Sequence, residues 1–295
     1  MSFFEAIDPK FNTYVLGNAP VKQLATDFDW VEGPVWFGDA NCLLFSDIPN
    51  NRIMRYTPGA GVSVYREPAH FSNGHTRDRQ GRLISCEHGM RRVTRTEFDG
   101  SVSVIADIYD GKRLNSPNDV VVKSDNSIWF TDPHYGIMTN YEGHQSEQEL
   151  PCYVYRVDPG SGDIKAVITD MHCPNGLAFS PDESVLYVAD TGRMFEADSQ
   201  HIQAFYVNEN TVTGGEVFHA ISPGCADGFR LDTDGNIWSS AADGVHCLSP
   251  DGKLLGKIRV PELVSNVCFG GRRNHQLFIT ATSSVYMICL NRQGL

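Results

Sequence analysis

Six polar residues open short strand-like runs along the chain, and their types suit a divalent cation. They are two carboxylates and four amides: Glu32, Asn73, Asn118, Asn175, Asp227 and Asn266. Hard oxygen ligands of this kind favour Ca²⁺ or Mg²⁺, whereas Zn²⁺ usually takes nitrogen and sulfur. Two carboxylates with amide carbonyls would neutralise such an ion and leave positions open for water or substrate. Open positions are what metal catalysis requires.

The same residues have a simpler interpretation as turn formers. Asn-Gly and Asp-Gly are common turn pairs, and three of the six openings carry one: Asn73-Gly74, Asn175-Gly176 and Asp227-Gly228. Glu32 does not fit this interpretation, because glutamate is not a turn former. We favour the ligand interpretation and keep the turn interpretation as the alternative.

The spacing of the openings indicates the architecture. Successive openings are 41, 45, 57, 52 and 39 residues apart. A repeat of roughly 40 to 50 residues is typical of a β-propeller blade, which buries its faces only by stacking on its neighbours. Most units continue through an Asp, Asn or Gly turn into a second strand, as at residues 128–132, 185–190 and 237–240. No helix-length periodic stretch competes with this pattern.

These repeats predict one all-β domain over residues 1–295, a six-bladed β-propeller with blade openings near residues 32, 73, 118, 175, 227 and 266. The first strand of each propeller blade lines the central channel, so the six side chains are expected to form a ring there, with the metal site in the channel. A candidate strand at residues 21–25 is expected to pair with the last blade and close the ring. Residues 138–151 lengthen the third unit and are expected to form a lid or a surface excursion.

Several phrases, taken together and in order, resemble the regucalcin and gluconolactonase family of sugar lactone hydrolases, and the bacterial gluconolactonase branch most. They are WVEGP (30–34), NGHTRD (73–78), NSPNDV (115–120), TDPHYGI (131–137), PNGL (174–177) and ADG (226–228). The resemblance runs from about Trp30 to the C-terminus. It implies a six-bladed propeller with one divalent metal in the channel, held by Glu32, Asn175 and Asp227, with Asn118 as a further metal or substrate contact.

The resemblance also implies a reaction, the metal-dependent hydrolysis of an aldonolactone such as gluconolactone or xylonolactone to the aldonic acid. A lactone is a cyclic ester, so its carbonyl must be polarised and a water deprotonated. Asp227 is the candidate general base. The candidate contacts for sugar hydroxyls are Asn118, Asn73, His75, Glu87 and His134. Animal members of the family have an arginine where this chain has Ser116, and Arg113 is a possible substitute.

Two other functions compete with this hypothesis. One is an organophosphate triesterase of the diisopropyl fluorophosphatase type, whose metal site looks similar, although its channel histidine has no clear counterpart in residues 280–284. The other is a non-catalytic metal-binding propeller. The expected cofactor is one divalent ion, Ca²⁺ first, with Mg²⁺, Mn²⁺, Zn²⁺ and Fe²⁺ as alternatives. The sequence decides neither the sugar nor the oligomeric state.

Composition narrows the partners and the compartment. A net charge of −12 argues against nucleic acid or an anionic membrane as partners and leaves a small molecule. The eight cysteines include no Cys-x-x-Cys pair, and no Gly-x-Ser-x-Gly motif is present. Residues 1–6 carry neither a basic region nor a long apolar run, so no signal peptide is expected. A cytoplasmic location with reduced thiols follows as the expectation.

Overall fold

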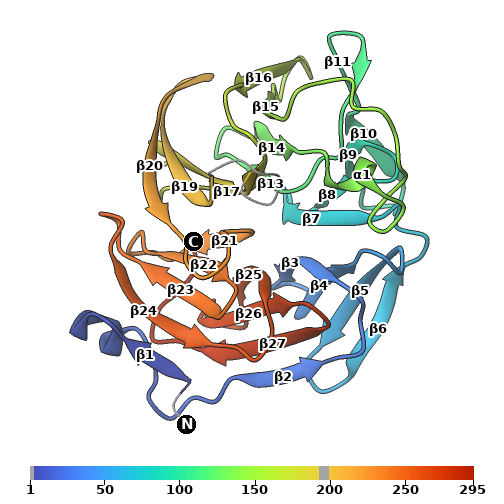
Figure 1. Cartoon of the computed structure of the whole chain (residues 1–295). Coiled ribbons are helices and arrows are strands. Elements are labelled where there is room, and N and C mark those ends of the chain that lie inside the picture. The colour runs from blue at the N-terminus through green and yellow to red at the C-terminus, as the bar shows by residue number, and fades with distance from the viewer. Residues whose placement is uncertain (1–2, 193–198) are drawn as a thin grey trace.

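The computed structural model describes residues 3–192 and 199–295. It shows six antiparallel sheets arranged around a central channel (Figure 1). In each blade four consecutive strands pair in the order in which they follow along the chain, with the first of them innermost, and two blades carry one further strand at the outer edge. The prediction of an all-β, six-bladed β-propeller is therefore confirmed. No helix in the described part of the chain is long and apolar enough to cross a membrane.

The first three blades are regular four-stranded meanders. Blade one consists of β3 (Val31–Phe37), β4 (Cys42–Asp47), β5 (Arg52–Thr57) and β6 (Gly61–Arg66). Blade two consists of β7 (Ser72–Arg77), β8 (Leu83–Glu87), β9 (Arg92–Thr96) and β10 (Val102–Ala106). Blade three consists of β13 (Val120–Val122), β14 (Ile128–Asp132), β15 (Tyr153–Val157) and β16 (Ile164–Ile168).

The last three blades follow the same order, and two of them take an extra strand from the N-terminal segment. Blade four consists of β17 (Pro174–Phe179), β18 (Val185–Asp190), β19 (His201–Asn208) and β20 (Thr211–Ala220). Blade five consists of β21 (Phe229–Leu231), β22 (Ile237–Ala241), β23 (Gly244–Leu248) and β24 (Leu254–Arg259), with β1 (Phe4–Ala6) outside. Blade six consists of β25 (Val264–Gly270), β26 (Gln276–Ala281), β27 (Ser284–Cys289) and, outermost, β2 (Lys22–Ala25).

Aspartate side chains build the turns inside the blades. Between β21 and β22 the Asp232 carboxylate accepts the N–H groups of Asp234 at 3.0 Å and Asn236 at 2.9 Å. Gly235 has φ +80° in this turn, a conformation that glycine adopts without a Cβ penalty. Asp232 also accepts the indole N–H of Trp238 at 2.9 Å. One side chain therefore sets the turn and fixes a large residue of the core.

The core lies between blades. Among the described residues, buried apolar side chains form six clusters, one at each contact between neighbouring blades. Trp129 and Trp238 are the largest fully buried side chains, on the second strands of blades three and five. Burial of this kind supplies the main favourable term of folding, so each blade depends on both neighbours.

The N-terminal segment packs against the propeller where blades five and six meet. Strand β2, at the predicted position, pairs antiparallel with β27, and Gln23 Nε2 donates to Ser284 Oγ at 3.0 Å. Strand β1 pairs with β24. Between them the 3₁₀ helix η1 (Pro9–Thr13) buries Phe11 against Trp238, with ring centroids 6.2 Å apart.

Three short elements lie outside the blades. A two-stranded hairpin, β11 (Ile108–Tyr109) and β12 (Lys112–Arg113), follows blade two. Helix α1 (Tyr135–Met138) follows β14, and a loop without regular structure leads from it to β15. We call residues 139–149 of this segment the rim loop.

Candidate active site

β-Bulges place the ring residues. The register of the inner strand against its neighbour shifts between Glu32 and Val35, between Ser72 and His75, between Pro174 and Leu177, and between Val264 and Asn266. A bulge bends its strand and redirects side chains. Asn118 and Asp227 lie just before the inner strands β13 and β21. Glu32 and the four asparagines are all buried, between 2% and 6% exposed.

The glycines that follow four ring residues permit close approach between blades. A Cβ on Gly33 would lie 2.0 Å from the carbonyl oxygen of Asn73, and one on Gly74 would lie 2.3 Å from that of Asn118. A Cβ on Gly176 would lie 2.2 Å from the Asp227 carbonyl oxygen. Gly74 and Gly176 also donate their N–H groups to these carbonyls, at 2.8 and 3.0 Å. Only Gly33 of these has a positive φ, +55°, so the turn interpretation does not explain Gly74 or Gly176.

Glu32 is held at one oxygen and unpaired at the other. Its Oε2 accepts from the Gly33 N–H at 2.6 Å and from Asn266 Nδ2 at 2.9 Å. Its Oε1 is buried and has no hydrogen-bond partner among the described residues. Burial raises the pKa of Glu32 to about 7, against the lowering effect of those two hydrogen bonds. Asn266 accepts from the Val267 N–H at 2.8 Å, so its amide orients Glu32.

Asp227 lies in the same electrostatic environment. Burial, and then the negative charge of Glu32, raise the pKa of Asp227 well above its usual range. The Asn175 side chain donates a hydrogen bond to this carboxylate and lowers its pKa. The backbone N–H of Asp227 donates to Ser240 Oγ at 2.8 Å and fixes the residue at the end of its strand. Two carboxyls that each disfavour ionisation therefore lie close together in the channel.

A neutral histidine orients Asn73. His88 is fully buried, and burial lowers its pKa to about 4. Its Nδ1 lies 3.1 Å from the Glu142 carbonyl oxygen, which can only accept, so Nδ1 carries the proton. Nε2 is then the acceptor for Asn73 Nδ2, at 3.3 Å. The Asn73 Oδ1 atom is left buried without a partner among the described residues.

The oxygen atoms of this ring could bind one hard divalent cation. Glu32 Oε1 and Asn73 Oδ1 are unpaired buried oxygens, and the carboxylate of Asp227 lies near Glu32. Asn118 and Asn175 add buried amides to the ring. In residues 3–192 and 199–295 no group of three His, Cys, Asp or Glu side chains could hold a metal. A cation here would therefore depend on amide oxygens as well as carboxylates, which suits Ca²⁺ and related ions.

Two of the predicted sugar contacts, His75 and Glu87, are hydrogen-bonded to other side chains inside the blades. His75 Nε2 lies 2.8 Å from Ser46 Oγ and its Nδ1 lies 2.9 Å from Ser85 Oγ. Burial lowers the pKa of His75 to about 3. Glu87 accepts from Arg92 Nε at 2.7 Å and from Thr94 Oγ1 at 2.9 Å. The structure does not bring these two side chains into the ring.

The segment around Ser116 also differs from the pattern of the ring. Arg113 is exposed on β12, and its Nη2 donates to the Met90 carbonyl at 3.0 Å. Ser116 Oγ donates to the Pro133 carbonyl at 2.7 Å and accepts from the Gly136 N–H at 3.0 Å. Serine at this position therefore anchors the start of α1, and Arg113 points to blade two.

Tyr135 lies near Asp227, and His134 is its neighbour in the chain. His134 Nδ1 lies 3.2 Å from Cys152 Sγ, and burial lowers the pKa of His134. The Tyr135 hydroxyl is hydrogen-bonded to Thr191. Burial raises the pKa of Tyr135, and the charge of Asp227 acts in the same direction. His134 stacks on Tyr135, with ring centroids 6.2 Å apart, and its role as a substrate contact stays a prediction.

Two residues of the site have no counterpart in the sequence predictions. Glu142, in the rim loop, is partly buried, and its negative charge raises the pKa of both Glu32 and Asp227. Arg230 Nη1 lies 3.1 Å from the Asp119 carboxylate in a partly buried ion pair across the channel. Glu142 lies in the segment that lengthens the third unit, and nothing in the local pattern marks Arg230.

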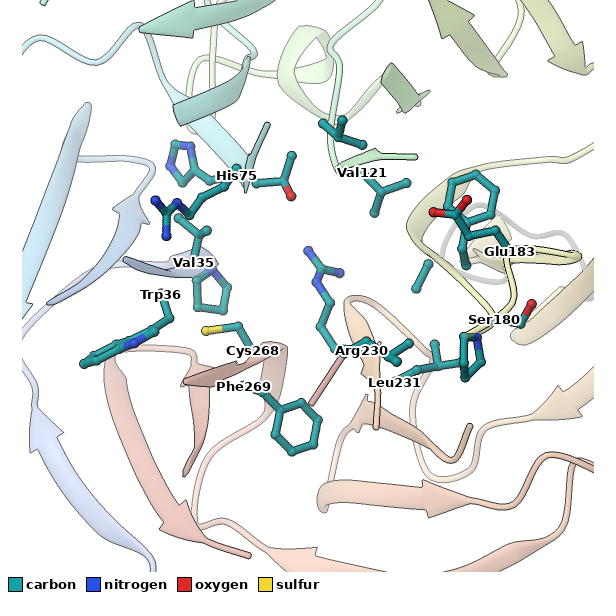
Figure 2. A pocket seen from close by; sticks show the side chains of 18 of the residues that line it. Val35, Trp36, His75, Val121, Ser180, Glu183, Arg230, Leu231, Cys268 and Phe269 are labelled. Atoms are coloured by element: carbon teal, nitrogen blue, oxygen red, sulfur yellow. The ribbon is translucent and has the colours of Figure 1, made fainter. Parts of the chain in front are cut away.

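The opposite end of the channel contains a separate cavity of about 480 Å³ (Figure 2). Its lining comes from later positions of the inner strands, including Val35, Val121, Arg230 and Cys268. Figure 2 shows Arg230 extending into the middle of this cavity. Since Arg230 pairs with Asp119, next to ring residue Asn118, the ion pair lies between the cavity and the ring.

Known proteins are similar to this chain in sequence and in fold. A family model described as the SMP-30/Gluconolactonase/LRE-like region matches residues 30–283. A gluconolactonase of Zymomonas mobilis is 32% identical, over 95% of this chain and 84% of that protein. Two solved structures superpose closely. One, described as a putative gluconolactonase, has a TM-score of 0.93 at 39% identity and covers 99% of both chains. The other, a gluconolactonase of Xanthomonas campestris, has a TM-score of 0.92 at 36% identity, covering 97% of this chain and 94% of that one. The chain belongs to the SMP-30/gluconolactonase/LRE-like family.

Proposed function

We propose that this protein is a metal-dependent sugar lactonase that opens an aldonolactone such as gluconolactone or xylonolactone to the aldonic acid. The observation that carries the proposal is the unpaired Glu32 Oε1 beside Asp227, in a buried ring of amides. An unpaired buried carboxylate oxygen is costly, and a bound cation would offset that cost. The gluconolactonases among the relatives support the same reaction class.

Four residues of the ring are proposed to bind the metal ion. Glu32, Asn175 and Asp227 would hold the divalent ion, with Asn118 as a further contact. When bound, the ion polarises the lactone carbonyl and offsets the negative charge that develops on its oxygen. Ca²⁺ is the first candidate, with Mg²⁺, Mn²⁺, Zn²⁺ and Fe²⁺ as alternatives, because oxygen donors accept most of these ions.

Asp227 is the proposed proton carrier. Its carboxylate takes a proton from the attacking water as the new C–O bond forms at the lactone carbonyl. When the tetrahedral species collapses and the ring C–O bond breaks, the same group returns the proton to the departing oxygen. Water and lactone thus give the hydroxy acid with no net proton held by the enzyme. Glu32 stays ionised throughout.

Other side chains are proposed to bind and orient the sugar. Asn118 is a buried amide of the ring, and the unpaired Asn73 Oδ1 is available to accept from a hydroxyl. His134, next to Tyr135, is a further proposed contact. His75, Glu87 and Arg113 are not included, because their polar atoms are engaged elsewhere or lie away from the ring. We also propose a cytoplasmic location, since the eight free thiols suit a reducing compartment.

The test is acid release at constant pH from a panel of aldono-1,4- and 1,5-lactones. Chelated protein is measured with and without each divalent metal added back. Turnover that returns with a metal would support the proposal and identify the ion and the preferred ring. Turnover no faster than spontaneous hydrolysis with every metal would contradict it and favour a non-catalytic metal-binding propeller. Organophosphate triesters in the same panel test the phosphotriesterase alternative.

A further inference from the structure

The rim loop is fixed at the mouth of the channel. His88 connects Asn73 of the ring to the backbone of Glu142. The Ser146 N–H donates to the Ile137 carbonyl at 3.0 Å, and the His144 ring meets Phe71 edge-on at 5.2 Å. These contacts attach the loop to α1 and to blade two. The position of Glu142 is therefore defined by the same histidine that orients a ring residue.

Close backbone packing adds to this attachment. A Cβ on Gly143 would lie 2.1 Å from the Gly136 carbonyl oxygen, and one on Gly136 would lie 2.5 Å from the His88 side chain. The loop, the helix and His88 are in contact at positions where only glycine fits. Residue 142 directly precedes this crossing, so its backbone has little room to shift.

The Glu142 carboxylate has no partner of its own. Among the described residues, no hydrogen bond or ion pair reaches its side chain. Burial raises the pKa of Glu142 to about 7. Elsewhere in the loop, Glu149 pairs with Arg91 at 3.3 Å, and Glu147 is exposed to solvent. A carboxylate that is partly buried without a donor is expected to receive one from a ligand.

The chemistry of the ring restricts that ligand. The charge of Glu142 raises the pKa of both Glu32 and Asp227, and that of Glu32 raises the pKa of Asp227, so three carboxyls lie near one another and disfavour a negatively charged ligand. Carboxylates and amide oxygens accept hydrogen bonds, and the unpaired Asn73 Oδ1 is a second acceptor close to the loop. A neutral cyclic ligand that carries several hydroxyl groups can donate hydrogen bonds to these acceptors.

We propose that Glu142 is a specificity-determining residue, whose carboxylate accepts hydrogen bonds from ring hydroxyls of a neutral polyhydroxylated substrate at the mouth of the channel. This role rests on the proposed sugar lactonase function and adds a residue that selects for hydroxyls. A hydrogen bond to a charged acceptor stabilises a complex by about 1.5–3 kcal/mol, so its loss corresponds to about a ten- to hundredfold change in affinity.

The test measures binding without turnover. The probe is 1,5-anhydroglucitol, a six-membered cyclic polyol without a carbonyl, titrated calorimetrically into the metal-loaded protein. We expect Glu142→Gln and Glu142→Ala to weaken its binding about ten- to hundredfold. The matched control is Glu147→Gln, an exposed carboxylate of the same loop, which should bind the probe as the unchanged protein does. Ca²⁺ titration should give an unchanged affinity for Glu147→Gln and a change of less than tenfold for the Glu142 variants, which lose a charge near Glu32 and Asp227 but no metal ligand.

Activity supplies the second readout. Glu142→Gln should lower kcat/KM for a hydroxylated lactone while leaving hydrolysis of δ-valerolactone, which has no hydroxyls, unchanged. Three results would overturn the inference: no binding of the probe by the unchanged protein, equal binding by Glu142→Gln, or a tenfold or larger loss of Ca²⁺ affinity, which would make Glu142 a metal ligand. An unchanged protein that binds the probe but opens no lactone would contradict the proposed function and leave this inference supported.

Discussion

At the residue scale, the two ring carboxyls are in an environment that opposes their charge. Burial raises the pKa of Glu32 to about 7 and that of Asp227 well above its usual range, with Glu32 as the second cause. Neutral amides surround them, and the cation Arg230 is paired with Asp119. Without metal, the two carboxyls therefore stay protonated up to about neutral pH, and a metal ion that binds to them must displace their protons.

This arrangement predicts a pH dependence of stability in the chelated protein. Glu32 binds its proton more tightly in the folded state than in the unfolded state, where its pKa is near 4.5. Its contribution is therefore fully present below the unfolded pKa and is lost as pH rises through about 7. We expect Tm of chelated protein to fall by several degrees from about pH 5 to about pH 8, measured by scanning calorimetry.

Two controls separate this effect from general titration. Glu32→Gln should flatten the fall in Tm, because the amide has no proton to lose. A divalent metal should raise Tm more at about pH 8 than at about pH 5, since its ligands must be deprotonated. A chelated protein whose Tm does not differ between the two pH values would contradict the assigned environment of Glu32.

Asp227 carries the second prediction at this scale. Asp227→Ala should lower kcat for lactone hydrolysis by about 10² to 10⁴ or more, because it removes the residue that we propose as both proton carrier and metal contact. The far-ultraviolet circular dichroism spectrum should be unchanged. Asp234→Ala, in the exposed turn of the same blade, is the control and should keep full activity. Near-normal turnover by Asp227→Ala would remove Asp227 from the mechanism.

At the element scale, the inner strands meet through glycine. Gly176→Ala would bring a Cβ to 2.2 Å from the Asp227 carbonyl oxygen and force two blades apart. We expect a loss of about 1–3 kcal/mol in the free energy of unfolding, the usual range for overpacking, together with weaker metal binding. Gly17→Ala has nothing within 4 Å and should change neither quantity. Denaturant unfolding and metal titration of both variants would check this, and a stable Gly176→Ala with full metal affinity would exclude the close-approach role.

The rim loop gives a prediction of its own. His88→Ala removes the connection between Asn73 and Glu142, so the loop should open more often. Limited proteolysis should then cut within residues 139–149 at least several times faster, and kcat/KM should fall. His219→Ala removes a comparable bond, from Nδ1 to the Gly252 carbonyl at 2.8 Å, and is the matched control. Equal cleavage of both variants would show that His88 does not hold the loop.

The sequence pattern could reveal the strand openings and hairpins, because turn residues and alternation are local. It could not reveal which side chains turn toward the channel. His75 lies two residues after a predicted strand opening and Glu87 ends β8, yet serine hydroxyls engage His75, and Arg92 and Thr94 engage Glu87. Glu142 lies outside any repeat, and only the crossing of Gly143 over Gly136 directs it to the ring. Such positions depend on contacts between distant residues.

At the scale of the whole molecule, the propeller closes through strand pairing between residues that are distant in sequence. The number of blades could be predicted from the spacing of the openings, since each blade repeats one pattern. The extra strand β1 on blade five could not, because three residues carry no clear alternation. Both β1 and β2 are edge strands that cover the outer strands β24 and β27.

Deletion of residues 1–28 should destabilise the protein. It removes two edge strands and the buried Phe11, which packs on Trp238. We expect Tm to fall by ten degrees or more, because burying one large aromatic side chain alone stabilises by about 3–5 kcal/mol. Deletion of residues 1–8 removes β1 and keeps β2, and should cost less. Unchanged melting of the longer deletion would refute the closure role.

Ring closure through β2 also has a consequence for biosynthesis. Gln23 and Ser284, which are hydrogen-bonded across this junction, are 261 residues apart along the chain. A ribosome that adds roughly 5 to 20 residues per second needs about 13 to 52 s to translate that interval. Throughout this time β2 has no partner strand and the nascent propeller stays open. Slow codons late in the message would prolong that state and increase the demand for chaperones.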